Sequence, residues 1–172
     1  MVVSQALMLV FGSGETSDFW VDGLRVWWTS VRRRCRVITR LVIYLDNGPQ
    51  NSGTRTQFLK RLIAFVDWSG LEVRLVYYPP YHSKYNPIER CWSALERKWN
   101  GVILRCWAVI RACALRMTRC GRHPQVRRIE KTYPKKVRVS KAEMKAHSAR
   151  LERSPHLPKY DITIKPKPPN GR

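Results

Sequence analysis

The order strand, helix, strand in residues 40–78 is the feature that most constrains the fold of this chain. "RLVIYL", residues 40–45, is an apolar run rich in β-branched and aromatic residues, so we expect a strand buried on both faces, as in a parallel sheet. "DNGPQNSG" breaks the run, and a helix follows that ends at Gly70. "LEVRLVYY", residues 71–78, predicts a second strand. The segment is therefore a βαβ unit, whose crossover is nearly always right-handed.

Capping patterns predict the helices around this unit. Thr54 with Gln57 forms a capping box at the start of the crossover helix, and Ser140 with Glu143 forms another before a charged helix that would end near residue 153. Three more helices are expected. The first covers residues 18–31 and is capped by Thr16 or Ser17, and the last covers residues 102–117. The middle one starts with Asn86 as cap and Pro87 as first residue, ends near Gly101, and has an apolar stripe of Ile88, Trp92, Leu95 and Trp99. Residues 2–11 predict a short buried strand, and residues 154–172 an extended tail.

The charge of the chain points to a polyanionic partner. The net charge is +21, and residues 105–172 hold 19 Lys and Arg against 4 Asp and Glu, so this part alone carries +15. Such a charge opposes compaction unless a polyanion neutralises it, and nucleic acid is the usual partner. No stretch approaches the roughly 20 apolar residues that a membrane helix needs, so we expect no membrane partner.

The cysteines favour neither a disulfide framework nor a zinc site. There are five, an odd number, and no Cys-x-x-Cys pair occurs. Cys106, Cys113 and Cys120 recur every seven residues, which predicts one stripe along a helix, used for packing rather than for metal binding even with His123 nearby. Reduced thiols fit a cytosolic protein.

Two acidic motifs follow the two predicted strands. Asp46 comes directly after the first, and "PPYHSKYNPIE", which ends at Glu89, follows the second. Parallel strands end at the same edge of a sheet, where ligands of open α/β sheets usually bind. Divalent ions that stabilise phosphodiester cleavage prefer carboxylate oxygens. Asn47, His82 and Asn86 would add polar groups to this edge. The constellation predicts a metal-dependent nuclease site.

A structural explanation exists for each acid taken alone. Asp-Asn-Gly-Pro is good turn chemistry, so Asp46 could simply shape a turn. Asn-Pro-Ile-Glu is a helix start in which Glu89 could be the capping carboxylate. The sequence alone leaves both explanations open beside the catalytic one.

Three segments together resemble a known family. "LVIYLDNGPQNSGTRTQFLKRL", "LEVRLVYYPPYHSKYNPIERCW" and "LERSPHLPKYDITI" are similar to the carboxyl part of an insertion-sequence transposase of the ISAzo-thirteen type. This type belongs to the DDE superfamily and is related to the mariner-like transposases. The resemblance implies a partial ribonuclease H-like (retroviral integrase-like) α/β fold: a parallel βαβ unit with flanking helices and a basic helical C-terminal extension. We expect a truncated catalytic domain over residues 1–120 and a basic extension and tail over residues 121–172.

The resemblance also implies a reaction and the residues that carry it. In the family, the reaction is metal-dependent DNA cleavage at the element ends, followed by strand transfer. Asp46 resembles the second acid of the triad and Glu89 the third, so both would hold Mg²⁺, which Mn²⁺ could replace. Asn47, His82, Lys84 and Asn86 would contact DNA or orient phosphate or water. The basic region from Arg105 onward would neutralise DNA phosphates.

The chain departs from the family at its amino-terminal side. The first acid of the triad is expected on a strand upstream of the helix that begins near Asp18, and only Glu15, in a turn, precedes that helix. Asp18 and Asp22 are expected to belong to the helix itself. We therefore expect a carboxyl-terminal fragment that lacks the first acid, the leading strands and any amino-terminal DNA-binding domain, and that is inactive or impaired alone.

Two other functions fit parts of the sequence. The first is a non-catalytic DNA-binding or subunit-interaction module that pairs with another copy or with an intact transposase. The second is a basic RNA- or ribosome-associated protein, although the motifs match no RNA-binding signature. In each transposase-derived case we expect a cytoplasmic protein that is associated with the nucleoid when bound to DNA.

Overall fold

The structure, a computed structural model, describes residues 6–79 and 86–168. The chain forms two compact units. We call Gly14–His82 with Thr132–Arg172 the sheet unit, and Met1–Ser13 with Ser83–Lys131 the helical unit. In the described part of the chain, no helix has the length and apolar character needed to cross a bilayer.

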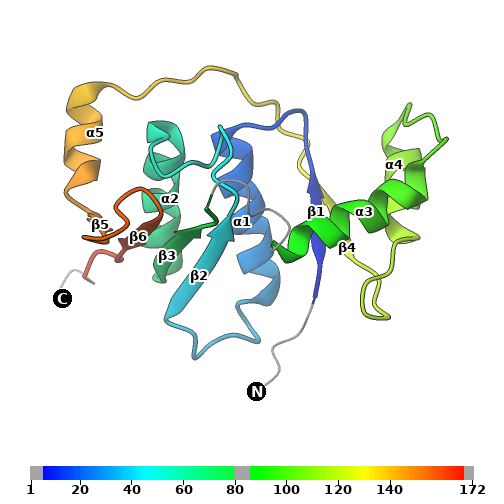
Figure 1. The fold of residues 1–172 in the computed structure, drawn as a ribbon, viewed down its shortest axis with the longest axis horizontal. Helices are drawn as coiled ribbons and strands as arrows, with labels where there is room; N and C mark the ends of the chain where they lie inside the picture. The colour runs from blue at the N-terminus through cyan, green and yellow to red at the C-terminus, as the bar shows by residue number, and fades with distance from the viewer. Residues whose placement is uncertain (1–5, 80–85, 169–172) are drawn as a thin grey trace. The chain divides into compact units, whose positions relative to one another are not determined.

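The sheet unit is built on a four-stranded mixed sheet of order β2-β3-β6-β5 (Figure 1). β2 (Arg40–Leu45) and β3 (Glu72–Tyr77) are parallel along their whole length, so the predicted βαβ unit is confirmed. β6 (Asp161–Ile164) runs antiparallel to β3, and β5 (Leu151–Arg153) runs antiparallel to β6. Among the described residues, β2 therefore pairs on one side only and is an edge strand.

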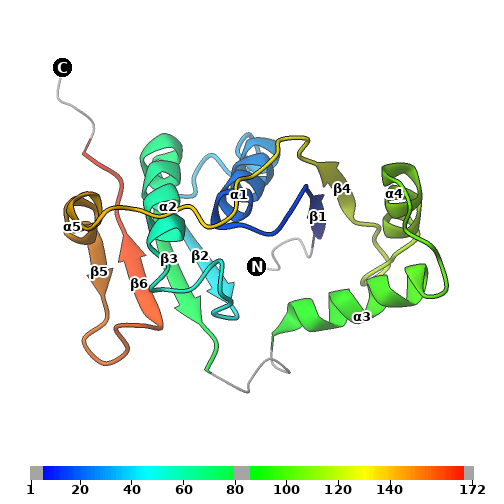
Figure 2. The ribbon, with the colours of Figure 1, turned by 90° about the horizontal axis from the view of Figure 1, so that it is seen from above.

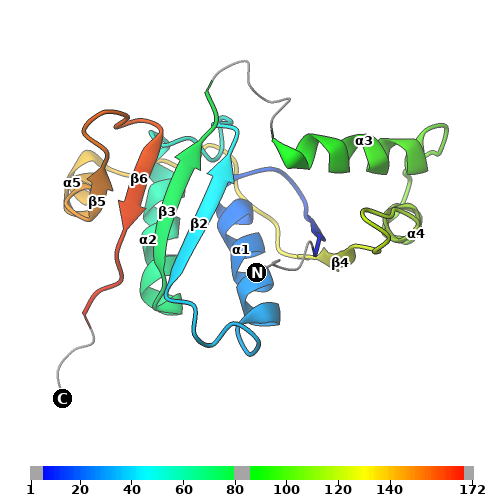
Figure 3. The same ribbon diagram turned by 60° about the horizontal axis from the view of Figure 1, so that its bottom comes forward.

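The prediction that residues 40–45 are buried on both faces is wrong. Burial alternates along β2, with Leu45 buried while Val42 is 41% and Tyr44 is 61% exposed. The reason is that α1 (Ser17–Val31) and α2 (Thr56–Ser69) lie side by side over one face of the sheet, as the views of Figures 2 and 3 show. An apolar run does not reveal whether one face or both will be covered.

The core of the sheet unit lies between these two helices and the strands. Both helices contribute, and the strands supply every second residue, as expected for a sheet covered on one face. Its buried apolar members include Val21, Trp28, Phe58, Leu59, Leu62, Phe65, Val66, Leu45, Val73, Leu75, Tyr77, Ile162 and Ile164. This core fixes the ends of β2 and β3, and thereby the loops that follow them.

The caps of α1 and α2 only partly follow the predictions. Thr16 caps α1, since its Oγ1 accepts a hydrogen bond from the Phe19 N–H. The predicted capping box of Thr54 and Gln57 is wrong, because α2 begins at Thr56 and its N-cap, Arg55, makes no side-chain cap bond. The Gln57 side chain instead donates to Asp18. The C-terminal end is confirmed: Gly70 follows α2 with a left-handed φ of 72°.

The carboxyl-terminal part of the chain belongs to the sheet. α5 (Lys141–Ser148) is capped as predicted by Ser140, whose Oγ accepts from the Glu143 N–H, but it ends before the predicted residue 153. The predicted extended tail over residues 154–172 is wrong at Asp161–Ile164, which form β6. The alternation of this segment explains the difference, because Ile162 and Ile164 both point into the core.

The helical unit contains β1 (Met8–Phe11), α3 (Pro87–Trp99), α4 (Trp107–Leu115) and β4 (Gln125–Arg128), and β1 pairs in parallel with β4. Its core includes Leu9, Cys91, Leu95, Ala114, Met117 and Val126. The strand predicted over residues 2–11 is therefore confirmed at Met8–Phe11, while residues 2–5 lie outside the described residues. In the predicted apolar stripe of α3, Trp92 is exposed, and Cys91 beside it is buried instead.

The helix predicted over residues 102–117 is shorter than expected. Residues 102–106 lie outside α4, and Cys106 is its N-cap. Cys113 is buried within the helix, whereas Cys120 lies beyond it with a left-handed φ of 49°. The three cysteines therefore do not form one helical stripe. The His123 ring forms a hydrogen bond with the backbone, since its Nδ1 lies 2.8 Å from the Leu115 carbonyl oxygen.

Candidate active site

Asp46 follows β2 at the carboxyl edge of the parallel pair, as predicted. Its carboxylate accepts two hydrogen bonds from described residues, the Gly48 N–H at 3.3 Å and the Asn51 amide Nδ2 at 3.2 Å. Both bonds fall on the same oxygen, Oδ1. Oδ2 receives none from the described part of the chain, and the residue is exposed. The carboxylate is thus held through one oxygen while the other stays open.

The loop after Asp46 explains this arrangement. An Asp side chain that accepts from the N–H two residues later makes an Asx turn, which the Asp46 to Gly48 bond supplies. The turn closes further because the Asn51 N–H donates to the Gly48 carbonyl at 3.2 Å. Asn47 lies between them, exposed and with a left-handed φ of 61°, a conformation that Asn tolerates better than most residues. Turn chemistry and an open carboxylate oxygen therefore coexist in Asp46.

A residue at the end of β3 also holds this loop. The Tyr77 hydroxyl donates to the Asn51 carbonyl oxygen at 2.7 Å. Burial raises the pKa of the Tyr77 hydroxyl well above its usual value; Arg153 opposes the rise, and Asp46 adds to it. Tyr77 is therefore a neutral donor throughout the physiological range. The Tyr78 N–H donates to the Leu45 carbonyl at 2.9 Å, which ties the ends of the two parallel strands together.

The hairpin of β5 and β6 forms the rest of the frame. Arg153 donates from Nη2 to the Gly53 carbonyl at 2.9 Å and from Nη1 to the Pro158 carbonyl at 2.7 Å. The Tyr77 N–H donates to the Tyr160 carbonyl at 2.8 Å. Residues more than a hundred positions after Asp46 thus hold the loop in which its partner Asn51 sits. Sequence reasoning missed them because Arg153 was expected at the end of a helix, and Pro158 and Tyr160 in an extended tail. The period-two pattern of "DITI" was the available signal.

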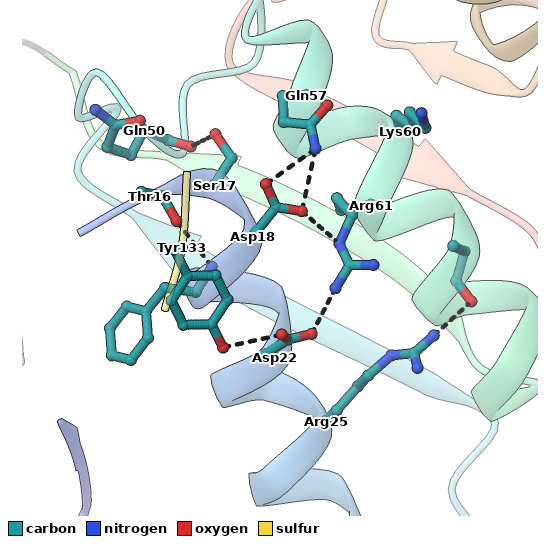
Figure 4. Close-up of polar contacts among 12 residues, drawn as sticks. Thr16, Ser17, Asp18, Asp22, Arg25, Gln50, Gln57, Lys60, Arg61 and Tyr133 are labelled. Atoms are coloured by element: carbon teal, nitrogen blue, oxygen red, sulfur yellow. Dashed lines mark hydrogen bonds and ion pairs between the residues drawn. The ribbon is translucent and has the colours of Figure 1, made fainter. Parts of the chain in front are cut away.

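Two other acids of the sheet unit are neutralised. Arg61 of α2 reaches both Asp18 and Asp22 of α1, with its Nε 2.9 Å from Asp18 Oδ1 (Figure 4). Gln57 Nε2 also donates to both oxygens of Asp18, and the Tyr133 hydroxyl donates to Asp22 at 2.9 Å. Burial, followed by Asp22, raises the pKa of Tyr133. These acids join the two helices, and both lie in the helix as the sequence predicted.

Asp46 differs from these acids in its electrostatics. Among the described residues it forms no ion pair, whereas Asp18, Asp22, Asp67 and Asp161 each have an arginine partner. An exposed carboxylate with one free oxygen and no cationic partner matches what a hard divalent cation binds. No group of three His, Cys, Asp or Glu side chains suited to a metal occurs within residues 6–79 and 86–168.

Glu89 lies in the helical unit, in the first turn of α3. The predicted helix start is confirmed: Asn86 is the N-cap, its Oδ1 accepts from the Ile88 N–H at 3.2 Å, and Pro87 is the first helical residue. Asn86 is buried and is used in the cap, while Glu89 is exposed and makes no side-chain hydrogen bond with a described residue. Its carboxylate therefore does not close a capping box with the described residues.

The predicted site residues are divided between the two units. Asp46 and Asn47 belong to the sheet unit, and Asn86 and Glu89 to the helical unit. His82 and Lys84 lie outside the described residues. The pairing of Asp46 with Glu89 stays a prediction. The carboxylate chemistry at each of the two positions fits a magnesium or manganese ion.

Comparison with known proteins gives the family. No curated protein matches the chain, and neither does any solved structure. The family model described as the Rhodopirellula transposase DDE domain matches residues 2–166, almost the entire sequence, and includes both acidic motifs. The chain therefore belongs to this family of insertion-sequence DDE transposases.

Proposed function

We propose that this chain is part of a transposase catalytic domain with a ribonuclease H-like fold. Asp46 and Glu89 together bind Mg²⁺, or Mn²⁺ in its place, for the cleavage and transfer of DNA strands. The observation that carries the proposal is the state of Asp46. Its carboxylate stands at the carboxyl end of β2, is fixed through Oδ1, is open at Oδ2 and has no cationic partner among the described residues. Membership of the DDE family supports this reaction.

The chemistry follows from what such ions do. A divalent cation bound by carboxylates stabilises the charge on the attacking and leaving oxygens of a phosphodiester. Asp46 and Glu89 are the ligands in this proposal. Asn47, His82, Lys84 and Asn86 lie beside them in the sequence and contact DNA or orient phosphate or water. With a third carboxylate of the family's triad unassigned in this chain, we expect cleavage by the isolated chain to be weak.

The basic residues give the second part of the proposal. Residues 105–172 carry +15 and bind DNA phosphates without reading sequence. DNA is therefore the main partner, and the protein acts in the cytoplasm, at the nucleoid when DNA is bound. We also propose that residues 1–120 belong to the catalytic domain and that residues 121–172 form a basic extension. This division rests on charge and function.

Manganese calorimetry on the full chain tests the metal site. Asp46→Asn and Glu89→Gln should each abolish the site, while Glu96→Gln, an exposed acid on the same helix as Glu89, should leave it unchanged. Nicking of supercoiled DNA with Mn²⁺ then reports residual chemistry. Equal manganese affinity in the wild type and in both acid variants would refute the proposal.

A second candidate is a subunit-interaction module, and one observation favours it. β2 is an edge strand among the described residues, and Val42 and Tyr44 are exposed on it. An exposed, apolar edge strand is a template for pairing with another chain. If this is the function, light scattering should show a concentration-dependent oligomer that Tyr44→Lys dissolves, and DNA binding should persist without metal. A monomer at all concentrations would count against it.

A further inference from the structure

Asn51 is a buried polar residue in the loop after Asp46, and the proposed reaction gives it no role. Its side chain is 2% exposed. Nδ2 donates to Asp46 Oδ1 at 3.2 Å, whereas Oδ1 of Asn51 is shielded from solvent and has no hydrogen-bond partner among the described residues. The amide therefore satisfies one of its two polar groups and leaves the other buried without a described partner.

This arrangement disfavours a purely structural role. A buried carbonyl oxygen without a partner lowers stability, whereas an apolar side chain of similar size would avoid that cost. The Asp46 carboxylate does not need this hydrogen bond for its solvation, because it is exposed to water. The amide is therefore locally unfavourable at this position, and what it provides is an N–H donor to Asp46. Locally unfavourable residues of this kind are typical of functional sites.

Asn51 is itself held rigidly. Its carbonyl oxygen accepts from the Tyr77 hydroxyl at 2.7 Å, and its N–H donates to Gly48 at 3.2 Å. Tyr77 is a core residue at the end of β3. A continuous path of two hydrogen bonds thus runs from the sheet core through Asn51 to the Asp46 carboxylate.

We propose that Asn51 is a positioning residue: its amide fixes Oδ1 of Asp46, so that Oδ2 has one defined orientation toward a divalent cation. The inference rests on the proposed function of Asp46 as a metal ligand. Carboxylates that bind metals are commonly oriented by a second hydrogen-bonding partner, whose loss weakens metal affinity about 10- to 100-fold. The Gly48 N–H on the same oxygen acts in the same direction, and both bonds leave Oδ2 to the cation.

Gln57 provides a matched control within the same unit. It is also a buried amide, its Nε2 also donates to a carboxylate, and its Oε1 also has no partner in the described part of the chain. Its carboxylate, however, belongs to Asp18, which Arg61 neutralises. An amide donor beside a neutralised carboxylate should have no effect on metal binding.

The test uses the full chain, Mn²⁺ as the probe, and two readouts: calorimetric manganese affinity and the melting temperature without metal. Asn51→Leu should weaken manganese binding about tenfold without lowering the melting temperature of the metal-free protein. Gln57→Leu should leave manganese affinity unchanged. A structural role for Asn51 would instead lower the melting temperature and leave affinity unchanged, which would overturn the proposal.

Asp46→Asn separates the two proposals. If it abolishes manganese binding while Asn51→Leu binds like the wild type, the positioning role fails and the metal site stands. If Asp46→Asn also binds like the wild type, the metal site itself fails. Should Asn51→Leu not fold, Tyr77→Phe removes only the hydroxyl that holds Asn51. It should weaken manganese binding, while Tyr133→Phe, which removes a hydroxyl bonded to Asp22, should not. Equal affinity in both tyrosine variants would overturn the positioning role.

Discussion

The Arg153 guanidinium donates a hydrogen bond to the carbonyl oxygen of Gly53 at 2.9 Å, and so joins the β5–β6 hairpin to the loop that carries Asn51. The approach is close because Gly53 has no side chain. A Cβ there would lie 2.6 Å from the Lys159 carbonyl oxygen and 2.9 Å from Ile162 Cδ1. The loop that carries Asn51 therefore packs against the hairpin so closely that the two backbones are almost in contact at Gly53.

Gly53→Ala should destabilise the sheet unit. The added methyl group meets backbone, which cannot rotate away, so overpacking should cost about 1–3 kcal/mol. Thermal unfolding measures the change. Gly14→Ala is the control, because a Cβ at Gly14 meets nothing within 4 Å. If both variants melt at the wild-type temperature, the hairpin does not pack on this loop as described.

Gly48→Ala should weaken manganese binding while leaving the fold stable. Its Cβ would lie 3.3 Å from Asn51 Oδ1, so the Asn51 amide beside Asp46 must shift by a few tenths of an ångström, whereas the 3.5 Å to Asp46 Oδ1 is an ordinary contact. Disturbing such a supporting contact typically costs about tenfold in metal affinity. Calorimetry with Mn²⁺ provides the measurement, again with Gly14→Ala as the control. Unchanged affinity would mean that the cation does not depend on this geometry.

The stability of the sheet unit should fall on acidification, in part through Asp67. Two hydrogen bonds from Arg150, each 2.7 Å, hold the pKa of Asp67 below its ordinary value of 3.8, against the opposing effect of burial. A depressed pKa in the folded state contributes stability above pH 3.8, and this contribution is lost as the pH falls through the folded pKa.

Asp67→Asn should therefore lower stability at pH 7, by at most about 1 kcal/mol for a partly exposed pair. It should also reduce the loss of stability on acidification below about pH 5, relative to the wild type. Denaturant unfolding at several pH values tests both effects. Glu96→Gln is the control, since Glu96 forms no ion pair with a described residue. A pH profile identical to that of the wild type would contradict the role of Asp67.

DNA affinity should fall steeply with salt, and exposed basic residues that follow β4 should set part of the slope. Lys135, Lys136 and Arg138 are exposed and form no ion pair with described residues. Replacing all three with Gln should reduce the slope of log affinity against log salt by roughly 1 for each DNA phosphate that is no longer neutralised. Arg40→Gln is the control, because Arg40 is paired with Glu72. An unchanged slope in the triple variant would place the DNA surface elsewhere.

The local features of the fold could be predicted from sequence. The left-handed Gly70 and the caps at Asn86 and Ser140 depend on neighbouring residues, and the parallel pair of β2 and β3 follows from the order strand, helix, strand. The pairing of β6 with β3 depends on contacts between distant segments, so a basic, proline-containing end of the chain was mistaken for a tail. The exposure of Val42 and Tyr44 depends on which faces the helices cover, which an apolar run cannot specify.

The acids of the proposed site can be proposed from the sequence alone, whereas the residues that support Asp46 cannot. Asp46 was recognisable because an acid followed a strand end, and Glu89 because it followed an N-cap and a proline. Asn51 was not, because an asparagine in a glycine-containing loop is equally typical of an ordinary turn. Only its burial and its bonds to Asp46 and Tyr77 distinguish it.

The position of β6 in the sheet has a consequence for synthesis of the chain. Arg74 of β3 bonds to Asp161 of β6 across 87 residues, and among the described strands β5 pairs with β6 alone. While the ribosome adds those residues, at about 5–20 per second, β3 has one strand neighbour and an open side. The nascent sheet therefore spends several seconds with an unpaired apolar edge, a period in which chaperone binding or premature aggregation would compete with completion of the fold.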